Sequence, residues 1–190
     1  MTKRVFIIHG WRGNPEEGWL PWLKQGLEKQ GIEADSLAMP DTENPKIREW
    51  VGFLSQKVAE PNENTYFVGH SIGCQTILRY LESLDNKKVG GVVLVAPWIR
   101  LKGISEEEIE IAKPWLENPI DFKKVLQTTN KFTAIFSDND PYVPIEDSEI
   151  FKEKLGAKII TEHNKGHFTG DDNIFELPIV LEELEKMIKE

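Results

Sequence analysis

Apolar positions along the chain follow two patterns that alternate from one end to the other. Short runs rich in β-branched and other apolar residues predict strands, and they occupy residues 4–9, 32–39, 65–69, 89–96, 132–137 and 157–162. Apolar residues spaced three or four apart predict amphipathic helices, and they occupy 18–30, 45–58, the segment after Ser71, 145–154 and 176–188. This alternation predicts an α/β fold, a three-layer α/β/α sandwich around a mostly parallel six-stranded sheet.

One region, residues 97–130, interrupts the alternation. It contains two short helical patterns and three prolines, and it connects the fourth predicted strand to the fifth. We expect it to form either a small cap over a site or a plain crossover with a decorated loop. No linker, internal repeat or low-complexity tract divides the 190 residues, so we expect a single domain over residues 1–190.

Charge and cysteine content narrow the classes of function. The formal net charge is −9, which argues against nucleic acid or an anionic membrane as a main partner, because both bind basic surfaces. The single cysteine, Cys74, cannot form an intrachain disulfide, and it lies on the apolar side of a predicted helix, which favours a buried structural role. The first residues contain too short an apolar run for a signal peptide or a membrane span, so we expect a cytoplasmic protein.

Chemically active side chains follow four of the predicted strands. The sequences after the first, third, fifth and sixth strands are "HGWRG" (9–13), "GHSIG" (69–73), "SDNDPYVP" (137–144) and "HNKGHF" (163–168). Parallel strands bring their carboxyl ends to one edge of a sheet, so these segments can meet. A serine, an aspartate and a histidine appear in that chain order, which is the order expected for an α/β-hydrolase arrangement.

The "GHSIG" segment places Ser71 where a predicted strand ends and a predicted helix begins. A nucleophile turn strains the serine backbone and brings strand and helix close together, and Gly69 and Gly73 provide the room. The alternative is a turn serine that only caps the helix, which would not explain the other three loops. Ser71 is therefore the predicted nucleophile.

A serine hydroxyl needs a base to take its proton, and two histidines follow the last strand. We favour His167 in "GHF", because Gly166 lets the loop turn inward and the added residues give reach. His163 is the competitor, although it is better explained as an exposed or hydrogen-bonded histidine at the strand end. His70 is too near Ser71 in sequence for the usual geometry, and we expect it to pack behind the turn.

The acid of a triad holds the histidine in the right tautomer and stabilises its charge. Asp138 and Asp140 both follow the fifth strand, and we favour Asp140 because the following "PYVP" fixes the turn. Asp138 could instead bond its own backbone. The later "GDDN" (170–173) is interpreted as a solvated loop, since two adjacent aspartates are weak evidence for a cation site.

An oxyanion hole and a substrate pocket can be placed by position. The backbone N–H groups of Ile72, after the serine, and of Trp11, in the first loop, are the predicted oxyanion donors. Trp11, Trp98 and Phe168 follow strand ends and are the candidates to line the pocket. The other tryptophans are expected to pack in the core or between helices: Trp19, Trp22, Trp50 and Trp115.

The chain resembles a known family over nearly its whole length. The matching segments are "VFIIHGWRG", "WLPWLKQGL", "AMPDTENPKIREW", "NTYFVGHSIGCQTILRYL", "SDNDPYVP" and "GHF". They are similar to the small α/β-hydrolase-fold serine hydrolases typified by retinoblastoma-binding protein nine and its bacterial relatives. The resemblance implies a compact α/β-hydrolase fold, a triad of Ser71, Asp140 and His167, and hydrolysis of carboxyl esters or related acyl groups.

The sequence thus predicts a serine hydrolase that cleaves small esters or thioesters through an acyl-enzyme, with a small-molecule acyl substrate. Two alternatives stay open: an amide or peptide hydrolase with the same triad, and a protein-binding module on a hydrolase scaffold. Nothing in the sequence calls for a metal, nucleotide or flavin cofactor, since "HGWRG" lacks the lysine and spacing of a phosphate loop. A protein partner is possible but not indicated.

Overall fold

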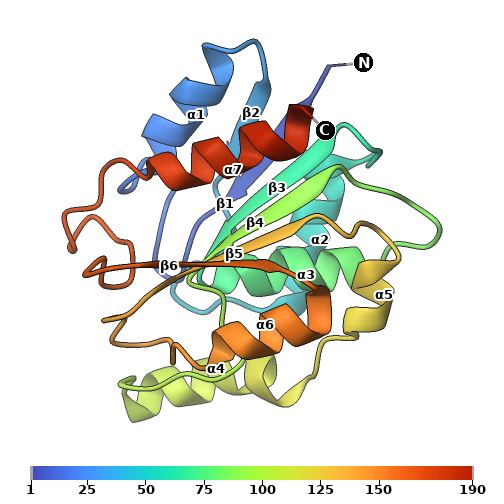
Figure 1. The fold of residues 1–190 in the computed structure, drawn as a ribbon. Coiled ribbons are helices and arrows are strands. Elements are labelled where there is room, and N and C mark those ends of the chain that lie inside the picture. Colours follow the sequence, from blue (N-terminus) through green and yellow to red (C-terminus); the bar gives the residue numbers. More distant parts are fainter. Residues whose placement is uncertain (1, 190) are drawn as a thin grey trace.

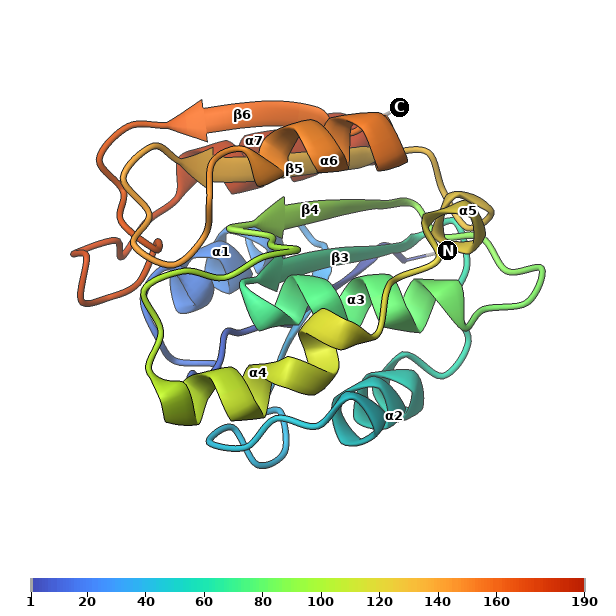
Figure 2. The same ribbon diagram turned by 90° about the horizontal axis from the view of Figure 1, so that it is seen from below.

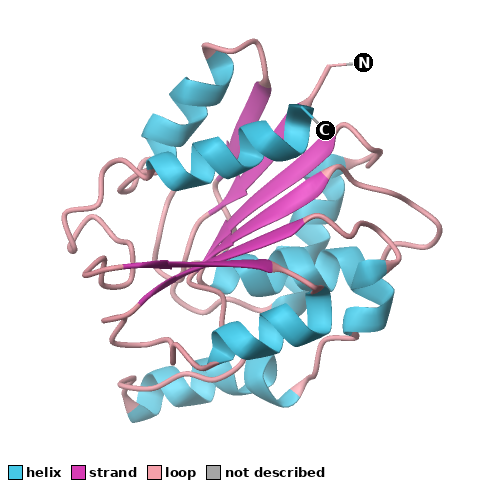
Figure 3. Ribbon diagram, in the orientation of Figure 1, coloured by secondary structure: helices cyan, strands magenta, loops and turns pink. Residues whose placement is uncertain are grey.

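A single six-stranded sheet forms the centre of the computed structural model, which describes residues 2–189. Its strands are β1 (Arg4–Ile8), β2 (Glu33–Leu37), β3 (Thr65–His70), β4 (Gly91–Val95), β5 (Phe132–Ser137) and β6 (Lys158–Glu162). They lie in the order β2-β1-β3-β4-β5-β6, and every neighbouring pair is parallel (Figures 1 and 3). The predicted sheet is confirmed, and it is wholly rather than mostly parallel.

Helices cover both faces of the sheet, which confirms the three-layer architecture (Figure 1). One face carries α1 (Leu20–Glu28) and α7 (Pro178–Lys189), which contact each other. The other carries α2 (Ile47–Val58), α3 (Ile72–Glu82), α5 (Phe122–Leu126) and α6 (Asp147–Leu155). Within residues 2–189, no helix is both long and apolar enough to cross a membrane.

Strand position in the sheet explains the apolar patterns. Every residue of the central strands β3 and β4 is buried, because helices pack on both sides of them. The edge strand β2 instead alternates exposed and half-buried residues. This strand is shorter than the predicted 32–39, since the backbone N–H of Met39 donates to His9 Nε2 (3.2 Å) rather than continuing the sheet.

The interrupting region 97–130 forms α4 (Glu106–Glu117) and α5, and α4 lies on the side of α3 that faces away from the sheet (Figure 2). Ser105 and Glu108 form a reciprocal capping box at the start of α4. Two buried side chains of α3 hold the region: Gln75 donates to the carbonyl of Trp98 (2.7 Å), and Arg79 donates to that of Trp115 (2.8 Å). The region is therefore attached to the helix layer through α3.

Candidate active site

Ser71 lies in the sharp turn from β3 into α3, with φ 53° and ψ −118°. A positive φ is unfavourable for a residue with a side chain, so this conformation must be held by its surroundings. The Ser71 N–H donates to the carbonyl of Val95, and the Ser71 carbonyl accepts from the N–H of Cys74, both at 2.9 Å. These bonds fix the turn to β4 on one side and to α3 on the other.

The two glycines of "GHSIG" lie where strand and helix nearly touch. A Cβ at Gly69 would be 2.7 Å from the backbone nitrogen of Cys74, and one at Gly73 would be 2.3 Å from the carbonyl oxygen of Ile8. Both obstacles are backbone atoms, which cannot rotate away. The steric reason inferred from the sequence therefore holds at both positions.

We expect Gly73→Ala to lower the free energy of unfolding by roughly 3 kcal/mol, because the added methyl group meets a fixed backbone carbonyl. Urea denaturation would measure the change. Gly52→Ala is the matched control, since Gly52 lies in α2 with open space around the added methyl group, and alanine favours a helix by about 0.5–1 kcal/mol. A Gly73→Ala protein as stable as wild type would contradict this interpretation.

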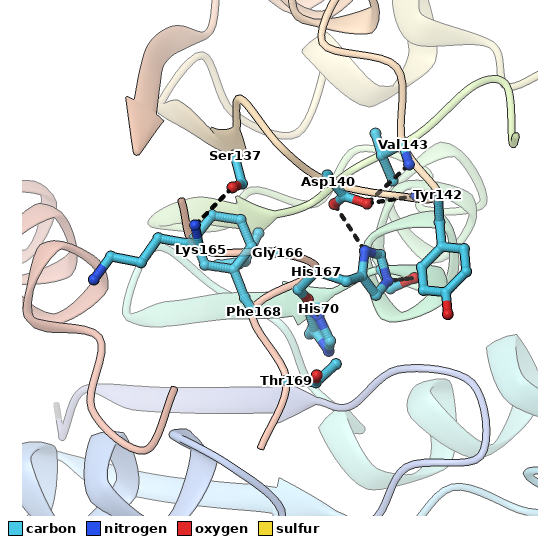
Figure 4. Close-up of polar contacts among 12 residues, drawn as sticks. His70, Ser137, Asp140, Tyr142, Val143, Lys165, Gly166, His167, Phe168 and Thr169 are labelled. Atoms are coloured by element: carbon cyan, nitrogen blue, oxygen red, sulfur yellow. Dashed lines mark hydrogen bonds and ion pairs between the residues drawn. The ribbon is translucent and has the colours of Figure 1, made fainter. Parts of the chain in front are cut away.

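Three side chains from different loops form a continuous hydrogen-bonded chain. His167 Nδ1 lies 2.8 Å from Asp140 Oδ2 (Figure 4). On the other side of the ring, His167 Nε2 lies 2.9 Å from Ser71 Oγ. The other oxygen of Asp140 accepts the backbone N–H groups of Tyr142 (2.8 Å) and Val143 (3.0 Å). Since a carboxylate only accepts, His167 carries its proton on Nδ1 and offers the Nε2 lone pair to the serine hydroxyl.

The competing pair, Asp138 and His163, bonds to itself outside this chain. His163 Nδ1 lies 2.6 Å from Asp138 Oδ2, but the side chains are 78% and 40% exposed, against 12% for His167 and 2% for Asp140. The backbone N–H of Asn164 and the bond to His163 lower the pKa of Asp138. The bond to Asp138 raises the pKa of His163. This exposed pair does not contact Ser71.

The loop that carries His167 is attached to the loop that carries Asp140 at successive residues. Ser137 Oγ accepts the N–H of Lys165 (3.0 Å) (Figure 4). Asn139 Oδ1 accepts the N–H of Gly166 (2.9 Å). The "SDND" segment after β5 therefore supplies more than the carboxylate beside His167. It also fixes the backbone that precedes the histidine.

The remaining two histidines are buried and bonded to backbone. His9 Nδ1 donates to the carbonyl of Gly10 (2.7 Å), and burial lowers the pKa of His9. His70 Nε2 lies 2.7 Å from the carbonyl oxygen of His167, and its ring packs edge-on against Trp19. Burial, and next the neighbouring His167, lower the pKa of His70 to about 3. The sequence predicted the packing of His70 but not its bond to the His167 loop.

A cavity of about 350 Å³ opens over Ser71 and His167. Its walls include Trp11 and Trp98, as predicted for the pocket, and also Leu101. The prediction for Phe168 is wrong: this side chain is 1% exposed in the core and does not line the cavity. Its left-handed backbone, with φ 58°, turns it away from His167, and its carbonyl accepts the indole N–H of Trp19.

Several cavity residues were not singled out from the sequence. Tyr142 lies edge-on to the His167 ring, with centroids 5.2 Å apart, and is 40% exposed. Arg12 forms ion pairs with Glu43 (3.0 Å) and with Glu108 of α4 (2.8 Å) at the rim. Tyr142 could have been found from the sequence, because it lies two residues after Asp140. No pattern in the sequence indicates that Arg12 pairs with Glu108.

The two backbone amides predicted as oxyanion donors both belong to cavity residues, Trp11 and Ile72. Within residues 2–189, neither N–H donates to another group of the protein. The Ile72 amide is also the first of α3, where the helix dipole favours negative charge. Both groups are therefore available to an anion formed beside Ser71.

The cysteine and the acidic loop have structural roles near this site. Cys74 is buried, and burial raises the pKa of its thiol, so it is a structural side chain. Among the described residues, no three His, Cys, Asp or Glu side chains are grouped to hold a metal ion. Asp172 of "GDDN" is half-buried and bonded to the His167 loop rather than solvated.

The sequence profile of the Serine hydrolase family matches residues 5–186. The chain belongs to this family. It is 35% identical to the Bacillus subtilis (strain 168) protein YdeN over 185 residues, which are 97% of this chain and 95% of YdeN. It is 26% identical to the serine hydrolase RBBP9 of Rattus norvegicus over 169 residues, 88% of this chain and 87% of that protein.

Solved structures show the same fold. The crystal structure of the B. subtilis ydeN gene product superposes with a TM-score of 0.91 at 33% identity, covering all of both chains. Est1E from Butyrivibrio proteoclasticus, in a structure with ferulic acid bound, reaches a TM-score of 0.76 at 17% identity, covering 98% of this chain and 88% of that one. The predicted α/β-hydrolase fold and the resemblance to bacterial relatives of retinoblastoma-binding protein nine are thereby confirmed.

Proposed function

We propose that this serine hydrolase cleaves small carboxyl esters or thioesters through an acyl-enzyme formed on Ser71. The observation that carries the proposal is the sheltered chain of bonds from Asp140 through His167 to Ser71 Oγ at the floor of a cavity. Membership of the Serine hydrolase family supports hydrolysis.

In the first half of the reaction, Ser71 Oγ attacks the substrate carbonyl carbon while His167 Nε2 takes the hydroxyl proton. Asp140 stabilises the imidazolium that forms. The carbonyl oxygen becomes an oxyanion, which the N–H groups of Trp11 and Ile72 bind. His167 then gives the proton to the leaving alkoxide or thiolate, and the acyl group stays on Ser71.

In the second half, water attacks the acyl-enzyme. His167 Nε2 takes a proton from this water and returns it to Ser71 Oγ as the bond to the acyl group breaks, so the products are a carboxylic acid and free enzyme. Because the same base acts in both halves of the reaction, His167 alone can carry out all of the proton transfers. The exposed pair Asp138 and His163 has no part in this scheme.

The size and lining of the cavity favour a small or extended substrate. Its volume of about 350 Å³ is at the low end for small-molecule sites. Apolar walls from Trp11, Trp98 and Leu101 suit an uncharged acyl or leaving group. An ester is favoured over an amide as the first substrate to test, since its leaving group needs less help from a general acid.

Treating the protein with a fluorophosphonate and measuring its intact mass tests the proposal. We expect one adduct per chain, located on Ser71 by peptide mapping, and faster turnover of a short p-nitrophenyl ester than of the matching anilide. Absence of an adduct under conditions that label a control esterase would contradict the proposal and favour a binding protein on a hydrolase scaffold. Faster cleavage of the anilide would instead indicate an amide hydrolase.

A further inference from the structure

The backbone of His167 is held on both sides by charged or polar side chains that are not part of the triad. Its N–H donates to Asp172 Oδ2 at 2.9 Å, and its carbonyl oxygen lies 2.7 Å from His70 Nε2. Figure 4 shows His70 beneath the His167 loop. The ring of His167 therefore projects toward Ser71 from a peptide segment whose donor and acceptor are both bound.

Asp172 makes the first of these contacts as part of a closed turn. The same carboxylate oxygen accepts the backbone N–H of Thr169 (3.0 Å) and its hydroxyl (2.7 Å). A Cβ at Gly166 would lie 2.0 Å from the other oxygen, Oδ1. Glycine at 166, which also has a left-handed φ of 54°, therefore leaves the space that this carboxylate occupies.

His70 makes the second contact from the end of β3, one residue before the nucleophile. A carbonyl oxygen can only accept, so Nε2 of His70 carries the proton. The ring is 8% exposed and lies between Trp19 and His167. Burial lowers the pKa of His70 to about 3, so the ring is neutral at neutral pH and carries its one N–H at Nε2, where the carbonyl oxygen accepts it. The residue that precedes Ser71 thus contacts the segment that carries its base.

We propose that His70 and Asp172 are positioning residues that together set the distance between His167 Nε2 and Ser71 Oγ. The inference rests on the proposed function, since positioning matters only if the pair transfers a proton. A displacement of about 1 Å between reacting groups can cost on the order of 10²-fold in rate. Removing either contact leaves the triad side chains in place but frees the backbone that aims the base.

Two matched pairs of variants separate the hydrogen bonds from the shape of the side chains. His70→Phe keeps a planar ring without a donor, whereas the amide of His70→Gln can reach the position of Nε2. Asp172→Ala removes the acceptor, whereas Asp172→Asn keeps one oxygen for the three donors. His163→Phe and Asp85→Ala, both at exposed positions, are the controls.

The measurements are kcat and KM on the short p-nitrophenyl ester, with active sites counted by fluorophosphonate titration. We expect His70→Phe and Asp172→Ala to lower kcat per titrated site by about 10- to 100-fold with KM within about twofold, and the Gln and Asn variants to stay within about fivefold of wild type. Counting titrated sites removes any loss that is due only to unfolded protein.

Unchanged kcat per titrated site in His70→Phe and Asp172→Ala would overturn the inference. So would equal losses in both members of each pair, because these would indicate shape rather than the hydrogen bond. A wild-type protein without a titratable serine would reject the proposed function instead, so the two failures are distinguishable.

Discussion

Replacing Ser71 with alanine is expected to lower kcat for a small ester by on the order of 10⁶, to the residual level that binding and oxyanion contacts alone supply. The reason is that no other hydroxyl or thiol lies in hydrogen-bond contact with His167 Nε2 among the described residues, and the nearby Cys74 thiol is buried. Initial rates on p-nitrophenyl acetate and the fluorophosphonate adduct mass measure the loss.

Ser55→Ala is the control for this substitution, because Ser55 is exposed on α2 and away from the cavity. Its rate should equal that of the wild type. Thermal unfolding should show that Ser71→Ala is folded. An adduct that persists on Ser71→Ala, or a fall in rate of less than about 100-fold, would show that another group is the nucleophile.

The sequence could place the three triad candidates because parallel strands end at one edge. Ser71, Asp140 and His167 follow β3, β5 and β6, which lie within four neighbouring strands of the sheet and end at the same edge. The observed order was not predicted, yet the side chains meet within hydrogen-bonding distance. Strand-end position therefore identified the candidates, and the observed strand order brings them within reach of one another.

Sequence reasoning favoured Asp140 over Asp138 and His167 over His163, and in the structure the two pairs differ in burial. Asp138 and His163 bond to each other at the exposed rim, whereas Asp140 and His167 bond inside. The flanking Gly166 and "PYVP" indicated the choice from the sequence. The direction in which each side chain points depends on the folded loop, which shows that Asp140 and His167 point inward.

Loop conformation also explains what the sequence missed. Phe168 follows His167 directly, but its left-handed φ directs the ring into the core. "GDDN" has the composition of a solvated loop, yet the chain turns back there, with the Asp172 N–H donating to the carbonyl of Thr169 (3.1 Å), and aims one carboxylate at the His167 backbone. Neither outcome follows from apolar patterning, because both depend on the local path of the backbone.

Asp140→Asn is expected to lower kcat by about 10⁴ while leaving the fold intact. Asp140 Oδ1 accepts the N–H groups of Tyr142 and Val143, so the carbonyl oxygen of an asparagine would take that position and turn its NH₂ group toward His167 Nδ1. The ring would then carry its proton on Nε2, where it cannot accept one from Ser71. The triad geometry would survive with the wrong tautomer.

Asp138→Asn makes the same chemical change two residues earlier and is the sharpest control. Its oxygen can still accept the N–H of Asn164, and its ring partner is the exposed His163, so we expect kcat within about threefold of wild type. Steady-state kinetics on one ester compare the two variants, and urea unfolding checks that both are folded. If Asp138→Asn loses as much activity as Asp140→Asn, or Asp140→Asn keeps more than about a tenth, the acid assigned here is wrong. A large loss confined to Asp140→Asn would mean that burial, rather than the presence of an Asp–His pair, selects the working acid and base.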